Sequence, residues 1–494
     1  MPVCLLKRVV IGISLYCLGV GASVARGDDY ERNRYIQSPF GINKPYNKDG
    51  LTIKPFLDDL RIHWAKAALF RRRIEVRKGQ YEWARTDREV NAMFNGGKTN
   101  ILAVVNPLTA WDVGGGLVLK ASGLPRKGAY YVSDWKAYER YLVALVTRYK
   151  EKIKYWMVFN EPEAEYESRL GEYIKLLKTT STLIRKIDPQ AKIVLAASSG
   201  NRKYVPFWHR LLGELRKHKK EDGYFDIFDL HTYQRADEAL SEVYDTFIAL
   251  FKEYGFGHKP VWMCEGGTHS GGYPKRHRFG RRIPYQTEKE QAILLVQRFF
   301  CAVSKKVQKV FWSNLREHEK FPGGRRFTLI GLIYNGVPKA GGCQGQLPCP
   351  DPGDGIKKLS YYTYKFLVEK FEGSDWDNIK LFRDVPKGVW LFEVKKGGKP
   401  VYVMCLEPNR TDGPRGKTIT VAVDKVPGQR ALLTYAVPAL AGGADVKPKD
   451  YLRLFTRREV DASQGILEVV LRDEPVYVEG VSIRKILSEK KNES

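Results

Sequence analysis

The strongest constraint on the fold is a repeated alternation of short apolar segments with amphipathic helical segments between Ser38 and Phe371. This alternation is typical of a parallel sheet, because consecutive parallel strands need a crossover helix between them. Eight apolar segments qualify as strands: 40–43, 62–69, 101–105, 155–159, 193–197, 225–230, 261–264 and 310–312. Helical patterns separate them, for example 135–150, 165–187, 236–254 and 288–305.

Eight strands with intervening helices predict an α/β chain with a closed (β/α)₈ barrel, also called a TIM barrel. An open dinucleotide-binding sheet would carry a Gly-rich phosphate loop after its first strand, and none is found here. After Gly373 the pattern changes to short β-like runs separated by Gly-containing turns. We therefore expect a barrel over 36–373, a small antiparallel β-sandwich over 374–485 packed after it, and a charged tail over 486–494.

The first 25 residues resemble a secretory signal peptide. Lys7 and Arg8 precede an apolar stretch, and Ser23-Val24-Ala25 offers small residues for cleavage. Gly and Ser interrupt the apolar stretch, which disfavours a permanent membrane anchor. We expect an exported protein, periplasmic or extracellular, with no membrane insertion once the signal is removed.

Export would permit disulfide bonds. Cys343 and Cys349 flank a five-residue loop-like stretch, so they form either a local disulfide or two free thiols. Cys264, Cys301 and Cys405 lie in apolar runs and are expected to be buried thiols. No Cys/His spacing resembles a zinc site.

Two glutamates directly follow apolar strands. Asn160-Glu161-Pro162 follows the fourth predicted strand, and Glu265-Gly266-Gly267 follows the seventh. Functional side chains of a TIM barrel come from the C-terminal ends of its strands, where the two carboxyl groups would meet. Glycosidic bond cleavage needs such a pair: one carboxylic acid protonates the leaving oxygen, and one carboxylate attacks or stabilises the sugar carbon. Either glutamate alone could equally be part of a salt bridge.

The context of this pair resembles glycoside hydrolase clan A, and is closest in style to its families 39 and 5. The resemblance covers about residues 40–371 and includes four further segments: 79–87, 148–156, 225–233 and 259–262. It implies a retaining glycoside hydrolase with Glu161 as acid/base and Glu265 as nucleophile, which needs no metal or organic cofactor. It also implies that Asn160 contacts the sugar 2-hydroxyl.

The resemblance suggests further substrate-binding residues. His231 and Tyr233 end the sixth strand on one face, and a Tyr at this place in the clan orients the nucleophile. Trp312 ends the eighth strand and is similar to a Trp on which a sugar ring stacks. Asn106, after the third strand, is a weaker candidate.

The second strand departs from the clan pattern. An Arg commonly supports the nucleophile there, whereas the corresponding position here is Lys66. Lys cannot form two parallel hydrogen bonds as Arg does, so either the alignment slips or the site is altered. The altered site keeps open an alternative: a catalytically weak or inactive barrel that binds carbohydrate.

The net charge of +27 favours anionic partners, although an ordinary solvated surface could have the same composition. Part of the charge lies close to Glu265 in sequence, at 275–278 and 281–282, and Arg316 follows the eighth strand. This basic rim suggests an acidic or sulfated carbohydrate as substrate, with a solvated basic loop as the alternative. No recognisable nucleic-acid-binding module is present, so nucleic acid is not expected as a partner. The sequence leaves the oligomeric state open.

Overall fold

The computed structural model describes residues 36–43, 53–109, 111–112, 131–233, 240–273, 283–317, 329–336, 352–407 and 416–491. The predicted signal peptide, the Cys343/Cys349 pair and the basic segment 275–282 lie outside the described residues. None of the described helices is long and apolar enough to cross a membrane.

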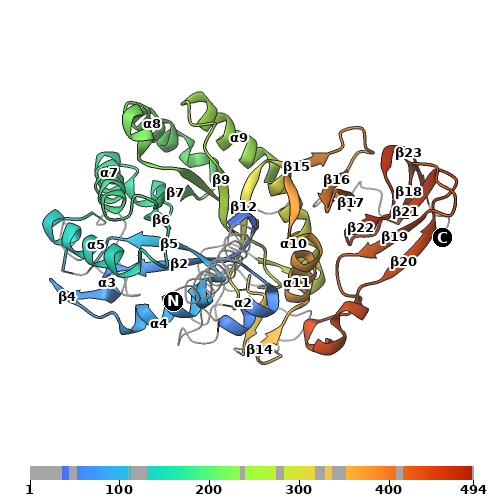
Figure 1. The fold of residues 1–494 in the computed structure, drawn as a ribbon, viewed down its shortest axis with the longest axis horizontal. Coiled ribbons are helices and arrows are strands. Elements are labelled where there is room, and N and C mark those ends of the chain that lie inside the picture. The colour runs from blue at the N-terminus through green and yellow to red at the C-terminus, as the bar shows by residue number, and fades with distance from the viewer. Residues whose placement is uncertain are drawn as a thin grey trace, which may run out of the picture.

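Eight parallel strands close into a barrel in the order β1-β12-β9-β8-β7-β6-β5-β2 (Figure 1). They are β1 (Phe40–Asn43), β2 (Trp64–Phe70), β5 (Asn100–Asn106), β6 (Tyr155–Val158), β7 (Lys192–Ser198), β8 (Ile227–Thr232), β9 (Val261–Gly266) and β12 (Val307–Ser313). All eight segments predicted from the sequence are among them, so the predicted TIM barrel is confirmed. Short hairpins follow several of these strands: β3 (Glu75–Arg77) with β4 (Gln80–Tyr81), β10 (Gly271–Tyr273) with β11 (Ile283–Gln286), and β13 (Ile333–Asn335) with β14 (Asp354–Lys357).

Helices surround the barrel, and two of them, α5 and α10, begin with a side-chain cap. They are α2 (Lys54–Leu60), α3 (Arg71–Ile74), α4 (Ala84–Phe94), α5 (Trp135–Tyr149), α6 (Glu163–Tyr166), α7 (Leu170–Ile187), α8 (Val205–Arg216), α9 (Leu240–Glu253), α10 (Glu288–Ser304) and α11 (Leu359–Phe371). A capping box of Thr287 and Glu290 starts α10, and the Asp134 side chain accepts a hydrogen bond from the Ala137 N–H at the start of α5.

One helix predicted from the sequence is two. The segment 165–187 was expected to be continuous, but α6 ends at Tyr166 and α7 begins at Leu170. The break allows α6 to bury Glu163 and Tyr166 directly after the end of β6. Burial of these two side chains therefore overrides a helical pattern that sequence periodicity alone would continue.

The C-terminal region consists of two antiparallel sheets, as predicted. One has the order β15 (Ser374–Leu381), β16 (Val389–Lys396), β17 (Lys399–Leu406), β22 (Val476–Glu479), β19 (Arg430–Tyr435), β20 (Arg457–Asp461). The other has the order β21 (Ile466–Val470), β18 (Lys417–Val423), β23 (Ile483–Lys491). The prediction of a charged tail from residue 486 is wrong up to Lys491, because β23 pairs with β18 as far as Lys417. Backbone pairing there does not require apolar side chains.

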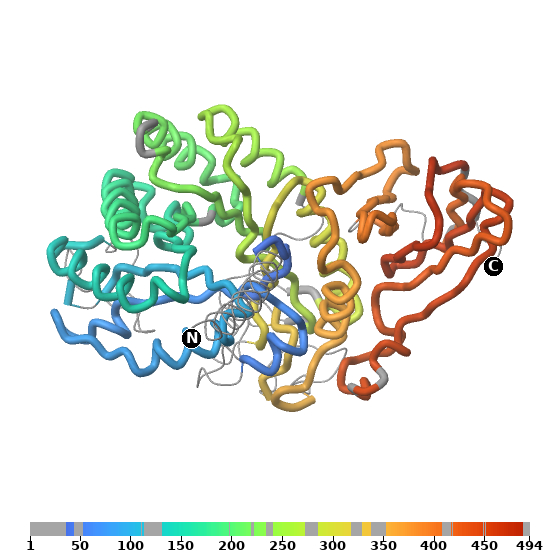
Figure 2. Tube along the Cα trace, in the orientation of Figure 1, coloured from blue at the N-terminus to red at the C-terminus, as the bar shows by residue number. Residues whose placement is uncertain are grey.

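The six-stranded sheet packs on both faces. Leu391 contributes to the core of the sandwich, whereas its neighbour Phe392 belongs to the barrel core, as expected for alternate residues of a strand. Phe392 stacks on Phe300 of α10, and the Gln297 side chain donates a hydrogen bond to the Leu406 carbonyl. Figure 2 shows α10 and α11 between the barrel and the C-terminal strands. The sandwich therefore packs against the helices on the outside of the barrel.

Candidate active site

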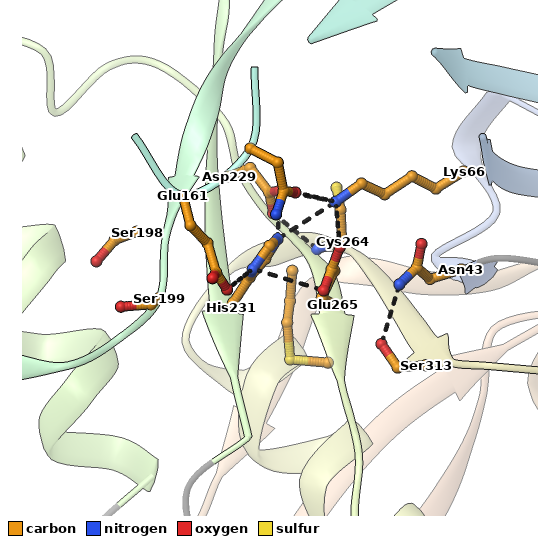
Figure 3. Close-up of polar contacts among 12 residues, drawn as sticks. Asn43, Lys66, Glu161, Ser198, Ser199, Asp229, His231, Cys264, Glu265 and Ser313 are labelled. Atoms are coloured by element: carbon orange, nitrogen blue, oxygen red, sulfur yellow. Dashed lines mark hydrogen bonds and ion pairs between the residues drawn. The ribbon is translucent and has the colours of Figure 1, made fainter. Parts of the chain in front are cut away.

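The two predicted glutamates meet at the C-terminal end of the barrel. Glu265 lies within β9, and Glu161 lies in the turn that follows β6. One carboxylate oxygen of each and one ring nitrogen of His231 all lie within 4.8 Å of one another (Figure 3). Phe159 and Glu161 have φ angles of 73° and 48°, which non-glycine residues rarely adopt. Such backbone strain concentrates at functional sites, and here it accompanies the turn that carries Glu161.

Glu265 is held from two sides. Lys66 donates a hydrogen bond to its Oε1 at 3.0 Å, and the Tyr233 hydroxyl donates to its Oε2 at 2.9 Å. Ser313 lies 2.6 Å from the Tyr233 hydroxyl, and the Asn43 amide donates to the Ser313 Oγ at 3.2 Å. Burial and the charge of Glu265 raise the pKa of Tyr233 well above its usual value, so the phenol keeps its proton. These contacts fix the carboxylate and favour its ionised form.

Lys66 occupies the position at which the clan pattern has an Arg. It extends from β2, is almost fully buried, and reaches Glu265 as well as the Asn160 side-chain oxygen at 3.4 Å. Burial would lower the pKa of Lys66, but the carboxylates of Glu265 and Asp229 outweigh burial and raise it. Lys66 therefore contacts the carboxylate that the expected Arg would support. The site itself is altered, because one ammonium group replaces a planar fork of donors.

His231 links the two glutamates to a buried aspartate. Its Nδ1 lies 2.8 Å from the Glu161 Oε1 and 3.8 Å from the Glu265 Oε2, and its Nε2 lies 3.2 Å from the Asp229 Oδ2. Burial disfavours the charged imidazole, but the carboxylates of Glu265 and Asp229 raise the pKa of His231 to about 9. At neutral pH His231 is therefore a cation, which is hydrogen-bonded to Glu161 and ion-paired with Asp229.

Two acidic residues of this cluster were missed by the sequence analysis. Asp229 is fully buried in β8, and its Oδ1 accepts the Cys264 N–H at 2.7 Å. A lone Asp two residues before His231 in an apolar strand was a usable signal, since both side chains face the barrel interior. Glu163 is fully buried, accepts the Ser199 N–H at 2.6 Å, and has a pKa raised to about 7, chiefly by burial. Its position two residues after Glu161 was the only clue.

The remaining predicted residues differ in their placement. Trp312 lies beside β9, the strand that carries Glu265: it pairs in register with Gly266, and a Cβ at Gly267 would come within 3.3 Å of its ring. Its indole donates to the Ile330 carbonyl, which fixes the ring plane. Asn106 ends β5, but its side chain accepts from the Leu108 N–H at 3.2 Å, and within the described residues no contact links it to either glutamate.

A metal ion is not favoured by this group of side chains. Glu161, His231 and Glu265 could together offer three ligand atoms. A ligating imidazole must be neutral, however, and the raised pKa of His231 keeps it protonated at neutral pH. Lys66 already neutralises Glu265. A buried carboxyl group opposite a partly exposed one, at the C-terminal end of a TIM barrel, instead resembles the carboxyl pair of a glycosidase.

Comparisons with known proteins agree with this class. Residues 133–320 match the family model described as the glycosyl hydrolase catalytic core. No curated protein matches the sequence significantly. The family model therefore indicates a glycosyl hydrolase catalytic core in this part of the chain, which carries both Glu161 and Glu265.

Solved structures show the same fold at low sequence identity. A family 39 glycoside hydrolase from Bacteroides cellulosilyticus WH2 has a TM-score of 0.58 at 14% identity, covering 90% of this chain and 80% of that chain. A glucosidase from Croceicoccus marinus has a TM-score of 0.54 at 13% identity, covering 90% and 96%. A family 30 endoxylanase from Clostridium papyrosolvens C71 has a TM-score of 0.51 at 12% identity, covering 90% and 96%. This likeness establishes the fold and leaves the substrate open.

Proposed function

We propose that the protein is a retaining glycoside hydrolase that acts by double displacement, with Glu265 as nucleophile and Glu161 as acid/base. The observation that carries this proposal is the distance between the two carboxyl groups, whose nearest oxygens lie within 4.8 Å. Retaining enzymes place these groups about 5–5.5 Å apart, whereas inverting enzymes leave about 6.5–9.5 Å for a water molecule.

The surroundings of each glutamate suit its proposed role. Glu265 is 6% exposed and bonded to Lys66 and Tyr233, which keeps it ionised and aimed for attack on the anomeric carbon. The Glu161 side chain is 33% exposed, so it can reach a leaving-group oxygen and later a water molecule.

In the first step the Glu265 carboxylate forms a bond to the anomeric carbon, while Glu161 gives its proton to the departing glycosidic oxygen. In the second step Glu161 takes a proton from water, whose oxygen displaces Glu265 from the sugar. His231 is a positioning residue in this scheme. Its imidazolium holds Glu161 at 2.8 Å and compensates the negative charge that Glu161 carries between the two steps.

The substrate we propose is a poly- or oligosaccharide, with acidic or sulfated glycans favoured by the net charge of +27. Asn160 would contact the 2-hydroxyl and Trp312 would stack on a sugar ring. The signal-like N-terminus supports export to the periplasm or the extracellular space, where such glycans are found. N-terminal sequencing of the secreted protein tests this location, with cleavage after Ala25 expected.

A depolymerisation screen with neutral, acidic and sulfated polysaccharides tests the activity. Proton NMR of the first product should show the anomeric configuration of the substrate, and inversion would refute the double displacement. Glu265→Gln should abolish cleavage. Glu151→Gln is the matched control, because this exposed carboxylate precedes β6 at the opposite end of the barrel.

A carbohydrate-binding protein without activity is the second candidate, favoured by Lys66 in place of Arg. It would bind glycans in the same screen and cleave none. The variant Lys66→Arg separates the two cases, since it would create activity in an inactive binder and only modulate activity in an enzyme.

A further inference from the structure

A cavity of about 600 Å³ lies at the opposite end of the barrel from the glutamates. Trp64, Tyr155 and Lys192, which line it, are the first residues of β2, β6 and β7, so the cavity opens at the N-terminal face. Trp262, Lys309 and Trp376 complete its wall. We call this cavity the barrel-base pocket. Its volume lies in the range of small-molecule sites, and catalytic residues of TIM barrels are not found at this face.

Most of the buried polar groups of the barrel-base pocket that lack a partner among the described residues are donors, and the hydroxyl of Ser374 is the exception. Lys309 is 5% exposed, and its ammonium lies 5.1 Å from the centre of the Trp64 ring and 5.9 Å from that of Trp262. It has no hydrogen bond or ion pair with any residue that the structure describes. The indole nitrogens of Trp262 and Trp376 are likewise buried without an acceptor among the described residues.

The same wall contains four aspartates, and the carboxylates of three of them, Asp222, Asp226 and Asp375, already have other partners. Asp222 pairs with Lys259 at 2.5 Å. Asp226 accepts hydrogen bonds from Arg185 and from the Ile193 N–H. The negative charges of Glu372 and Asp377 act on Lys309, but neither carboxylate forms an ion pair with it among the described residues. Burying an ammonium without a direct partner is costly, so Lys309 would gain from an anion that enters the pocket.

We propose that the barrel-base pocket binds a small organic anion, whose carboxylate meets Lys309 while its flat apolar body lies against the tryptophans. The two indole N–H groups supply further donors to the carboxylate. Binding at this face is separate from the glycosidase site, so the proposal goes beyond the proposed function and does not depend on it.

Isothermal titration of the full chain with benzoate tests the proposal. We expect one saturable site with a Kd below about 1 mM. Benzamide, which has the same shape without charge, and sulfate, which has charge without an apolar body, should each bind at least about tenfold more weakly. Absence of saturable benzoate binding, or equal binding of sulfate, would overturn the proposal.

Variants assign the binding to the pocket. Lys309→Met should weaken benzoate binding at least about tenfold, whereas Lys192→Met, at an exposed lysine of the same pocket, should change it less than about twofold. Equal losses in both variants would contradict the role of Lys309.

Wild-type protein gives a readout that does not depend on the folding of a variant. In a proton–nitrogen NMR spectrum, the indole signals of Trp262 and Trp376 should shift on titration with benzoate, and those of Trp83 and Trp135 should stay fixed, because these two lie outside the pocket wall. Benzoate binding that leaves the Trp262 and Trp376 signals unmoved would overturn the assignment.

Discussion

The buried carboxyl of Glu163 makes the stability of this protein depend on pH in a way that can be measured without a substrate. Its Oε1 accepts the Ser199 N–H at 2.6 Å, while its Oε2 has no partner among the described residues. Burial raises the pKa of Glu163 from 4.5 to about 7, although the Ser199 hydrogen bonds lower it. The native state is therefore most stable when the Glu163 carboxyl is neutral.

The variant Glu163→Gln removes the titration and keeps the shape and the acceptor for Ser199. A raised pKa means that the native state binds the proton more tightly than the unfolded state, so the stabilisation is complete below pH 4.5 and is lost as pH rises through 7. A shift of 2.5 units corresponds to about 3 kcal/mol. The free energy of unfolding of wild type should fall by about this amount relative to the variant between pH 4.5 and 7.5.

Urea unfolding followed by Trp fluorescence at several pH values measures this difference. All other groups titrate in both proteins, so their contributions cancel. Glu167→Gln, at an exposed carboxyl four residues further on, is the matched control and should show no pH-dependent difference from wild type. A wild-type-minus-Glu163→Gln difference that changes by less than about 1 kcal/mol over this range, or that changes in the opposite direction, would refute the reasoning.

Three further predictions follow from the contacts of the two ends of the barrel. Lys66→Met should destabilise the fold by about 3–5 kcal/mol in urea unfolding, because it leaves Glu265 buried without its cation. Lys66→Arg should be milder in the same measurement. Tyr233→Phe should lower kcat/KM by about tenfold, since the Glu265 carboxylate loses a donor; an unchanged kcat/KM would contradict the importance of this contact. Burial lowers the pKa of Lys309 from 10.5 to about 7, although the charges of Glu372 and Asp377 act in the opposite direction. The loss of folding stability caused by burying the charged ammonium is therefore complete below pH 7 and disappears as pH rises towards 10.5. Lys309→Met should therefore be more stable than wild type at pH 6.5, by up to about 5 kcal/mol, with the advantage shrinking by pH 9.5.

The sequence by itself determined the barrel and the reacting pair. Strand and helix periodicities are local properties, so all eight barrel strands could be located without tertiary information. Glu161 and Glu265 could be singled out because each follows an apolar strand directly, and parallel strands of a barrel end at the same face. The resemblance to clan A then suggested their roles and singled out Lys66, which the structure places against Glu265.

Only the tertiary structure decided which groups surround this pair. Lys66 and Glu265 are 199 residues apart, and barrel closure brings them within 3.0 Å. The charge of His231 depends on Asp229 and Glu265 together, and the neutral state of Glu163 depends on its burial beneath the turn after β6. The surroundings of Lys309 are likewise known only from the structure, in which the first residues of several barrel strands line the same pocket. Periodicity reports which face of an element is buried, whereas pKa values and binding depend on what lies across the barrel, and that is set by closure of the sheet.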